Sequence, residues 1–208
     1  VIQYCDELSE TARVTGAVNT VYPRGERVLG DNTDVIGIVN ALLHAGLKLN
    51  PERDEPAVIG GGATAISALT ALHKLGYRRA SVYARSLHKL GSVQEAADRL
   101  GVQLSTVALA EFPVEQKARR HNPVISTLPA RAADEWAPQL ANPAGASATH
   151  QPVLLDVAYS PWPSALASAW EASGGAVVSG LEMLLYQAVE QVLLFTDCTL
   201  QPAELLGL

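Results

Sequence analysis

Hydrophobic and polar positions along the chain follow two different periods. From about residue 56 to 180, short apolar runs of strand length alternate with longer segments in which apolar residues recur every three or four positions. This pattern predicts strands at 57–59, 80–84, 103–107, 123–127, 153–157 and 175–179, and helices at 64–75 and 90–100. Short strands separated by helices are typical of a parallel sheet with helices on both faces, which is an α/β fold.

The two ends of the chain predict other elements. The pattern favours a helix, two strands joined by a turn and a second helix before residue 46, at 1–14, 17–22, 26–29 and 35–45. After the last strand it favours one long helix at 181–195, which contains no Gly or Pro, and then a short helix beginning near Pro202. Residues 141–150 are small and polar and are predicted to form a surface loop. We therefore expect a sheet domain at 35–180 and a second part made of 1–34 and 181–208.

Composition narrows the possible partners. The net charge is −6, aromatic residues make up only 5% of the chain, and no long run of Lys and Arg occurs. These values argue against a nucleic-acid surface. The apolar stretches are too short or too interrupted to span a bilayer. The two cysteines form no C-x-x-C motif and the five histidines have no ligand spacing, so a reduced, cytoplasmic setting without a bound metal is the simpler interpretation.

A glycine-rich turn follows the strand at 57–59. Gly60, Gly62 and Ala65 occupy the three key positions of a G-x-G-x-x-A pattern, between a strand and a helix. The first glycine allows a tight turn, the second allows close approach of a pyrophosphate, and the alanine lets the helix pack near the strand. The backbone N–H groups and the helix dipole favour an anion at this point. The turn therefore predicts a doubly wound, Rossmann-like dinucleotide-binding sheet rather than a mere tight turn.

The end of the second strand indicates which dinucleotide is bound. An NAD site usually places Asp or Glu there to bind the ribose 2′-hydroxyl, whereas this chain has Ala84, Arg85 and Ser86, followed by Lys89. Arg85 and Lys89 can bind a 2′-phosphate, and Ser86 can donate a hydrogen bond to it. Cations at a helix start are otherwise disfavoured. We therefore favour NADP (NADPH) over NAD.

Two polar motifs lie close together before the second predicted helix. They are GAVNT at 16–20 and GDNTD at 30–34. Taken singly, Asn19 is typical of a turn residue and Asp34 of a helix N-cap. Two further motifs follow the glycine-rich turn: D-x-x-Y-x-P at 156–161 and GLEMLLYQA at 180–188.

In this order and at similar spacing, the four motifs and the glycine-rich turn resemble the shikimate dehydrogenase family over essentially the whole chain. The resemblance implies an NADP-binding Rossmann-like domain at 35–180. It also implies the remaining part of an α/β substrate-binding domain at 1–34 and 181–208. The implied reaction is the reversible reduction of 3-dehydroshikimate to shikimate with NADPH, in aromatic amino acid and chorismate biosynthesis, by a monomer or homodimer.

The resemblance also implies roles for individual residues. The substrate would be bound by Asn19, Asp34, Tyr159 and Gln187, and Asp34 would be half of a catalytic Lys–Asp pair. The cofactor would be held at its pyrophosphate, its adenosine ribose and its nicotinamide by three groups of residues: Gly60, Gly61, Gly62, Ala63 and Thr64; Ala84, Arg85, Ser86 and Lys89; and Val157, Gly180 and Met183. Thr127-Leu128-Pro129 stands where the family usually has an Ala-Thr-Ser/Pro-x-Gly loop, so Thr127 is a further expected cofactor contact.

Two family features have no counterpart in the sequence. The catalytic Lys of the family belongs to an N-x-T-x-P-x-K motif just before the first helix here, and a Ser-x-Ser grip on the substrate carboxylate lies further upstream; neither occurs in this chain. If residue 1 is the true start, we expect NADP binding without useful turnover. Two alternatives stay open: a quinate or quinate/shikimate dehydrogenase, and a non-catalytic NADP-binding module.

Overall fold

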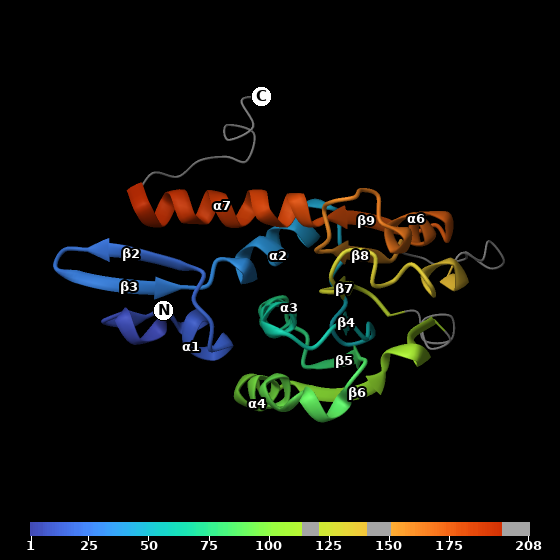
Figure 1. Cartoon of the computed structure of the whole chain (residues 1–208), viewed down its shortest axis with the longest axis horizontal. Coiled ribbons are helices and arrows are strands. Elements are labelled where there is room, and N and C mark those ends of the chain that lie inside the picture. The colour runs from blue at the N-terminus through green and yellow to red at the C-terminus, as the bar shows by residue number, and fades with distance from the viewer. Residues whose placement is uncertain (114–120, 141–150, 197–208) are drawn as a thin grey trace.

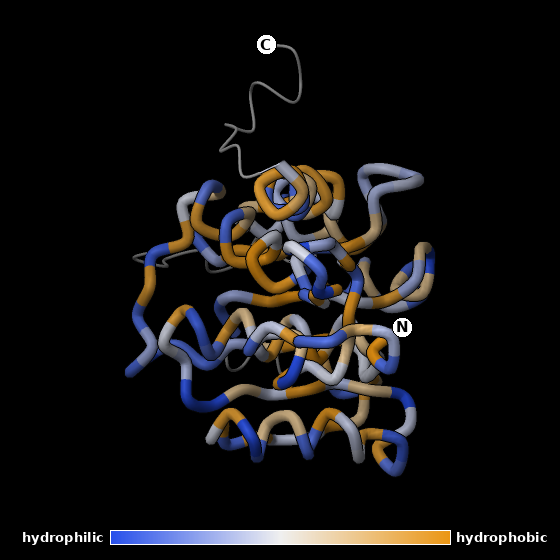
Figure 2. The backbone as a smooth tube through the Cα atoms, turned by 90° about the vertical axis from the view of Figure 1, so that its left-hand side faces the viewer, coloured by the Kyte–Doolittle hydropathy of each residue, from blue (hydrophilic) through white to orange (hydrophobic). Residues whose placement is uncertain are grey.

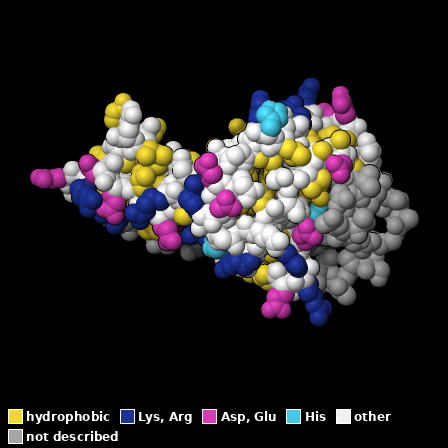
Figure 3. Space-filling model, turned by 90° about the horizontal axis from the view of Figure 1, so that it is seen from below, with side chains coloured by type: hydrophobic (Ala, Val, Ile, Leu, Met, Phe, Trp, Pro, Cys, Tyr) yellow, Lys and Arg dark blue, Asp and Glu magenta, His cyan; other side chains and the backbone are white. Residues whose placement is uncertain are grey.

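The chain folds into two sheets of different size, connected by two long helices. In the computed structural model, the residues described are 1–113, 121–140 and 151–196, so the predicted loop at 141–150 and the predicted helix near Pro202 lie outside them. A small three-stranded sheet lies at one end and a six-stranded sheet at the other (Figure 1). Viewed from below, the molecule has two lobes joined by a narrower waist (Figure 3).

The large sheet is entirely parallel and confirms the predicted α/β, Rossmann-like class. Its strand order is β6-β5-β4-β7-β8-β9. Its strands are β4 (Ala57–Ile59), β5 (Arg79–Ala84), β6 (Gln103–Ala108), β7 (Val124–Ser126), β8 (Val153–Asp156) and β9 (Ala176–Ser179). The chain runs outward from β4 to β6 and then returns to add β7 on the other side of β4. This reversal of direction is the switch point beside which such sheets bind ligands.

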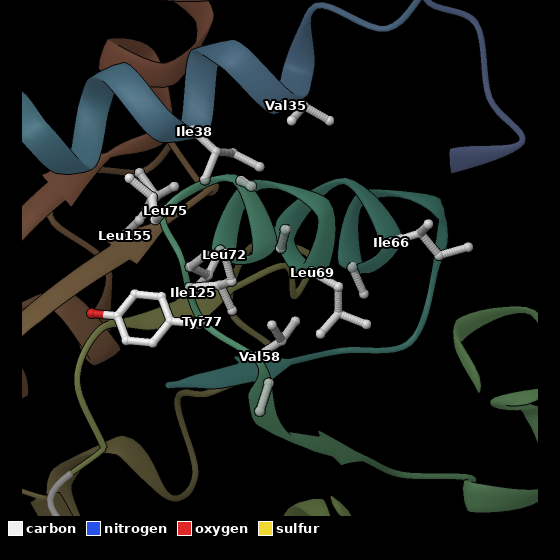
Figure 4. Packing of buried hydrophobic residues seen from close by; sticks show 14 of the residues in the cluster. Val35, Ile38, Val58, Ile66, Leu69, Leu72, Leu75, Tyr77, Ile125 and Leu155 are labelled. Carbon is white, nitrogen blue, oxygen red and sulfur yellow. The ribbon is translucent and has the colours of Figure 1, made fainter. Parts of the chain in front are cut away.

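Helices cover both faces of this sheet because successive strand residues point to opposite sides. Val58 and Ile125 face a core built with α2 (Asp34–His44), α3 (Ala63–Lys74) and α4 (Gly91–Leu100) (Figure 4). Ile59 and Leu154 face a second core under α6 (Ala165–Ala172) and the short turns η3 (Leu109–Glu111) and η4 (Ala137–Leu140). Helix α6 was not among the predicted elements, although Ser164 caps it by accepting a hydrogen bond from the Ala167 amide.

The small sheet has the strand order β1-β3-β2. In this part of the chain the helix predicted at 1–14 was wrong. Residues 1–14 do not form one helix: they form the turn η1 (Ile2–Tyr4), strand β1 (Glu7–Leu8) and the start of α1 (Glu10–Thr15). The Asp6 and Ser9 amides donate to the carbonyls of Val28 and Gly30, so β1 pairs in parallel with β3 (Arg27–Asp31). Pairing with a distant strand overrides the helical spacing of the apolar residues.

The predicted hairpin is present, but its turn lies two residues later. Strand β2 (Thr20–Arg24) continues through Pro23, and the chain turns at Gly25, which has a φ of +64°. A proline is compatible with β2 because this strand lies at the edge of the sheet and needs no ladder donor on its outer side. The register places Thr20 opposite Asp31. The two ends of the hairpin, which carry the polar motifs, therefore lie side by side.

Helix α7 (Gly180–Thr196) crosses from the large sheet to the small one and packs against α2 (Figure 1). In the view turned by 90°, α7 is seen almost end-on at the top, and much of it is coloured as hydrophobic (Figure 2). A Cβ atom at Gly37 of α2 would lie 2.7 Å from the Met183 carbonyl oxygen and 3.0 Å from Gln187 Cβ. The absence of a side chain at Gly37 therefore allows the two helices to touch along their backbones.

None of the helices in the described ranges combines the length and the apolar character needed to cross a bilayer.

Candidate active site

A pocket of about 620 Å³ lies at the switch point of the large sheet. It brings together eight of the predicted cofactor residues: Gly60, Gly61, Gly62, Ala84, Arg85, Ser86, Lys89 and Thr127. It is completed by Leu90, Leu128 and Pro129, which the sequence analysis did not assign to a site. Arg85 and Lys89 are both exposed, and none of the described lining residues is acidic. The pocket therefore presents two cations to an anionic ligand.

The glycine-rich loop is held in place by the neighbouring strand. Gly60 has a φ of +121°, and a Cβ there would lie 2.1 Å from Thr127 Oγ1. The Thr127 amide and hydroxyl donate to the Ile59 carbonyl at 2.7 and 3.0 Å. Only glycine fits this backbone conformation and this contact. Thr127 thus holds the glycine-rich loop in place through its two bonds to Ile59, independently of any contact with a ligand.

Gly62 differs from Gly60 in its surroundings. No atom lies within 4 Å of the position of a Cβ at Gly62, and its backbone is extended. Nothing inside the protein therefore requires glycine at this position. Open space at the N-terminus of α3, beside backbone N–H groups, is the space that a pyrophosphate occupies in dinucleotide-binding turns. Ala63 and Thr64 form the first turn of α3 but do not line the pocket, and Ala65 is fully buried.

A network of polar side chains lies where α2 begins. Asn19 Nδ2 donates to Asp34 Oδ1 at 2.8 Å, and Asn19 Oδ1 accepts from the Thr33 amide at 2.9 Å. Thr33 Oγ1 donates to Gln187 Oε1 at 3.0 Å. Three of the four predicted substrate residues, Asn19, Asp34 and Gln187, are therefore joined through Thr33. Tyr159, in the segment between β8 and α6, is 56% exposed and shares no hydrogen bond with them among the described residues.

Asp34 is not the helix N-cap that its position alone suggested. Thr33 occupies that position, while Asp34 is the first residue of α2 and its carboxylate accepts from Asn19. Burial raises the pKa of Asp34 above its usual value, and the hydrogen bond from Asn19 partly opposes this shift. Among the described residues no ion pair joins Asp34 to a lysine. The arrangement provides a carboxyl that can bind a ligand hydroxyl in either protonation state.

Asn32 connects this network to helix α3, and no role for it was predicted from the sequence. It is 3% exposed, and its Nδ2 donates to Thr15 Oγ1 at 3.1 Å and to Ser67 Oγ at 3.3 Å. Its Oδ1 accepts from the Asp34 amide at 3.1 Å. Ser67 lies on α3, the helix that begins at the glycine-rich loop. The polar network is therefore attached to the same helix that begins at the glycine-rich loop.

Two of the residues expected around a nicotinamide, Val157 and Gly180, directly follow strands β8 and β9. Gly180 starts α7, and a Cβ on it would lie 2.0 Å from the Val157 carbonyl oxygen, so these two residues are in contact. Met183 lies one turn further along α7, is 5% exposed and packs in the core between α2 and the sheet. No group of three or more potential metal ligands occurs in the parts of the chain that the structure describes.

A parallel sheet with a glycine-rich loop and two cations at its switch point is the architecture of a Rossmann-type dinucleotide-binding protein. The adjacent carboxylate and amide groups suit a small polar substrate.

Known proteins agree with this class. No family model matches the chain. The shikimate dehydrogenase of Mycobacterium tuberculosis superposes with a TM-score of 0.82 at 32% identity, covering 99% of this chain and 73% of that one. A shikimate 5-dehydrogenase from Mycobacterium fortuitum gives 0.82 at 33% identity, covering 99% and 72%. The pentafunctional AROM polypeptide of Saccharomyces cerevisiae is 34% identical over 198 residues, which are 92% of this chain but only 12% of that protein.

The chain belongs to the shikimate dehydrogenase family, as its motifs suggested. It spans about an eighth of the length of the AROM polypeptides that it matches and nearly three quarters of the mycobacterial dehydrogenases.

Because Asp34 is partly buried, the stability of the folded protein should depend on pH. Because the folded-state pKa of Asp34 is raised above 3.8, the folded protein binds this proton more tightly than the unfolded chain does. Its contribution to the free energy of unfolding is therefore largest at low pH and is lost as pH rises through the folded-state pKa. Asp34→Asn should raise the melting temperature near pH 7, and this gain should shrink toward about pH 3, where both forms are uncharged.

Thermal melts of the two proteins across this pH range test the prediction. Asp134→Asn, at an exposed position, is the matched control and should give no such pH-dependent gain. An Asp34→Asn protein that is no more stable near neutral pH than the unsubstituted one would show that burial does not destabilise the charged carboxylate.

Proposed function

We propose that the protein containing this chain reduces 3-dehydroshikimate to shikimate reversibly with NADPH. The observation that carries the proposal is the cationic glycine-loop pocket beside the Asn19–Asp34–Gln187 network, in a chain that belongs to the shikimate dehydrogenase family. Residues 35–180 would hold the cofactor. Residues 1–34 and 181–208 would hold the substrate, and 197–208 lie outside the described residues.

The cofactor site follows from the chemistry of the pocket. The pyrophosphate would lie against Gly60, Gly61 and Gly62, at the first turn formed by Ala63 and Thr64. The 2′-phosphate would be bound by Arg85 and Lys89, with Ser86 donating a hydrogen bond and Ala84 packing at the strand end. The nicotinamide would lie near Val157, Gly180 and Met183. Thr127 supports the glycine loop and reaches the same pocket.

The substrate site follows from its hydrogen-bonding groups. A polyhydroxylated ring needs several fixed donors and acceptors to define one pose, and Asn19, Asp34 and Gln187 provide them, with Tyr159 as a further hydroxyl. Hydride transfer from the reduced nicotinamide to the ring carbonyl carbon places negative charge on its oxygen, which must take up a proton in the same step. Asp34, with its raised pKa, would orient and tune the group that supplies this proton.

Assays with both cofactors and both candidate substrates test the function, in a protein that carries this chain together with the family's upstream N-x-T-x-P-x-K motif, because the sequence of this chain lacks that lysine. Reduction of NADP⁺ should depend on shikimate, be much slower with NAD⁺, and be slower with quinate. A preference for quinate and NAD⁺ would instead favour a quinate dehydrogenase. A protein that binds NADPH tightly but oxidises neither substrate would support a non-catalytic NADP-binding module. A reducing compartment is the expected setting, because the two cysteines of the sequence form no C-x-x-C motif. A monomer or homodimer is the expected assembly by resemblance to the family.

Replacing the cation at the end of β5 should change cofactor preference. Arg85→Ala should weaken NADPH binding by about 10- to 100-fold, the cost of a lost charge-assisted contact with phosphate, and should leave NADH binding nearly unchanged. Titrations monitored by the fluorescence of the reduced nicotinamide give both dissociation constants. Arg53→Ala removes an exposed arginine away from the pocket and serves as the control. Equal loss for both cofactors would remove Arg85 from phosphate recognition.

A methyl group at Gly62 should separate ligand binding from folding. Because no protein atom lies within 4 Å of its Cβ position, Gly62→Ala should leave the melting temperature within a few degrees of the original. The same methyl group would fill the space of the pyrophosphate and weaken NADPH binding by about tenfold or more, on the order of 1.4 kcal/mol. Calorimetry of unfolding and of binding measures the two effects. Unimpaired NADPH binding by a folded Gly62→Ala protein would place the pyrophosphate elsewhere.

A further inference from the structure

The direction of the Asn19 amide is fixed by its neighbours. The Thr33 backbone N–H points at one atom of this amide at 2.9 Å, and a backbone N–H can only donate. That atom must therefore be the Asn19 carbonyl oxygen, and the NH₂ group must face Asp34. Asn19 itself is exposed, so without such contacts its side chain could rotate freely.

Thr20 supplies a second donor to the same oxygen. It is 2% exposed, and its Oγ1 donates to Asn19 Oδ1 at 2.8 Å. The same Oγ1 accepts from Gln191 Nε2 at 3.0 Å. A hydroxyl has only one hydrogen, and with Gln191 donating to Thr20 Oγ1 that hydrogen can go to Asn19 Oδ1 at 2.8 Å or to Thr33 Oγ1 at 3.2 Å. The shorter contact, with Asn19, is the one that the hydrogen occupies. Gln191 lies one helical turn after Gln187 on α7, and the two glutamines contact adjacent threonines of the same network.

We infer that Thr20 and Gln191 are positioning residues, which form a chain of hydrogen bonds from α7 through Thr20 to the Asn19 carbonyl and so keep the Asn19 NH₂ group on Asp34. This positioning role adds detail to the proposed function. Its relevance to shikimate rests on that function. With its carbonyl held by Thr20 and Thr33, Asn19 can present only N–H groups to Asp34 and to a ligand. One amide hydrogen bonds the carboxylate, and the other is left for a ligand oxygen.

The state of Asp34 reports on this chain of hydrogen bonds. The bond from Asn19 favours the charged form of Asp34, and burial acts against it. Loss of the Thr20 donor loosens the Asn19 amide and weakens that bond. Asp34 then becomes harder to ionise.

Nuclear magnetic resonance of the protein without substrate or cofactor tests the inference. The Asn19 side-chain NH₂ signals should change with pH at the same midpoint as the Asp34 carboxyl carbon. In Thr20→Val, which keeps the shape but lacks the hydroxyl, the Asp34 midpoint should rise and the coupled change at Asn19 should be lost. Thr20→Ser should restore both. Gln191→Met should shift the Asp34 midpoint in the same direction by a smaller amount.

Thr70→Val is the matched control. Thr70 is 3% exposed and its hydroxyl donates to the Ile66 carbonyl within α3, away from the network, so this variant should lose stability without moving either signal. If Thr20→Val and Gln191→Met both leave the Asn19 and Asp34 titrations unchanged, the two residues serve packing alone and the inference is wrong. If Thr20→Val does not fold, Gln191→Met, at a half-buried position on the helix surface, decides between the two outcomes. Because no ligand is present, failure here leaves the proposed activity untouched.

Discussion

The two lobes of the molecule depend on one buried amide. Asn32 bonds Thr15 at the end of α1, Ser67 on α3 and the backbone of Asp34 at the start of α2. Unpaired polar groups at such a depth each cost about 1–3 kcal/mol, so these partners constrain one another strongly. This one side chain fixes where the hairpin ends, where α2 begins and how both lie against the helix that follows the glycine loop. The neighbouring polar network has a defined geometry because its point of attachment is defined.

Charge is distributed in opposite ways on the two sides of that junction. The pocket at the switch point presents Arg85 and Lys89, whose charged side chains are exposed to solvent. On the other side, the carboxyl of Asp34 is half-buried, which raises its pKa, and the single amide donor from Asn19 opposes this shift. A dinucleotide phosphate and the hydroxyl groups of a ring substrate make different demands: the first needs cations and backbone N–H groups, and the second need oriented dipoles. In the proposed function, separate sets of residues would meet the two demands.

Much of the large sheet could be predicted from the sequence because its strands are buried on both faces and therefore read as continuous apolar runs, as at Val153–Asp156. Helix ends could also be predicted, because the backbone there adopts a positive φ that favours glycine, as at Gly76 and Gly101. The predicted helix at 1–14 failed because β1 exists only through its pairing with β3, some twenty residues away. Local periodicity contains no information about that pairing.

The residues of the candidate site likewise divide into those that local patterns indicate and those that depend on contacts with distant parts of the chain. The glycine loop and Arg85 belong to local patterns and were found, and the ordered motifs pointed to Asn19, Asp34 and Gln187. Thr20 lay inside a motif that was already singled out, but its function depends on a contact with a glutamine 171 residues away. A second glutamine one turn after Gln187 was the only signal for that contact in the sequence. Side chains that act by orienting others leave little trace in residue type alone.

The contact at Gly37 has a mechanical consequence. Because α2 and α7 touch backbone to backbone there, Asp34 on one helix and Gln187 on the other are carried by a single stiff unit that runs from one lobe to the other. Bending of the molecule at its waist would then alter the distance between this unit and the glycine loop while leaving the spacing of the two side chains nearly constant.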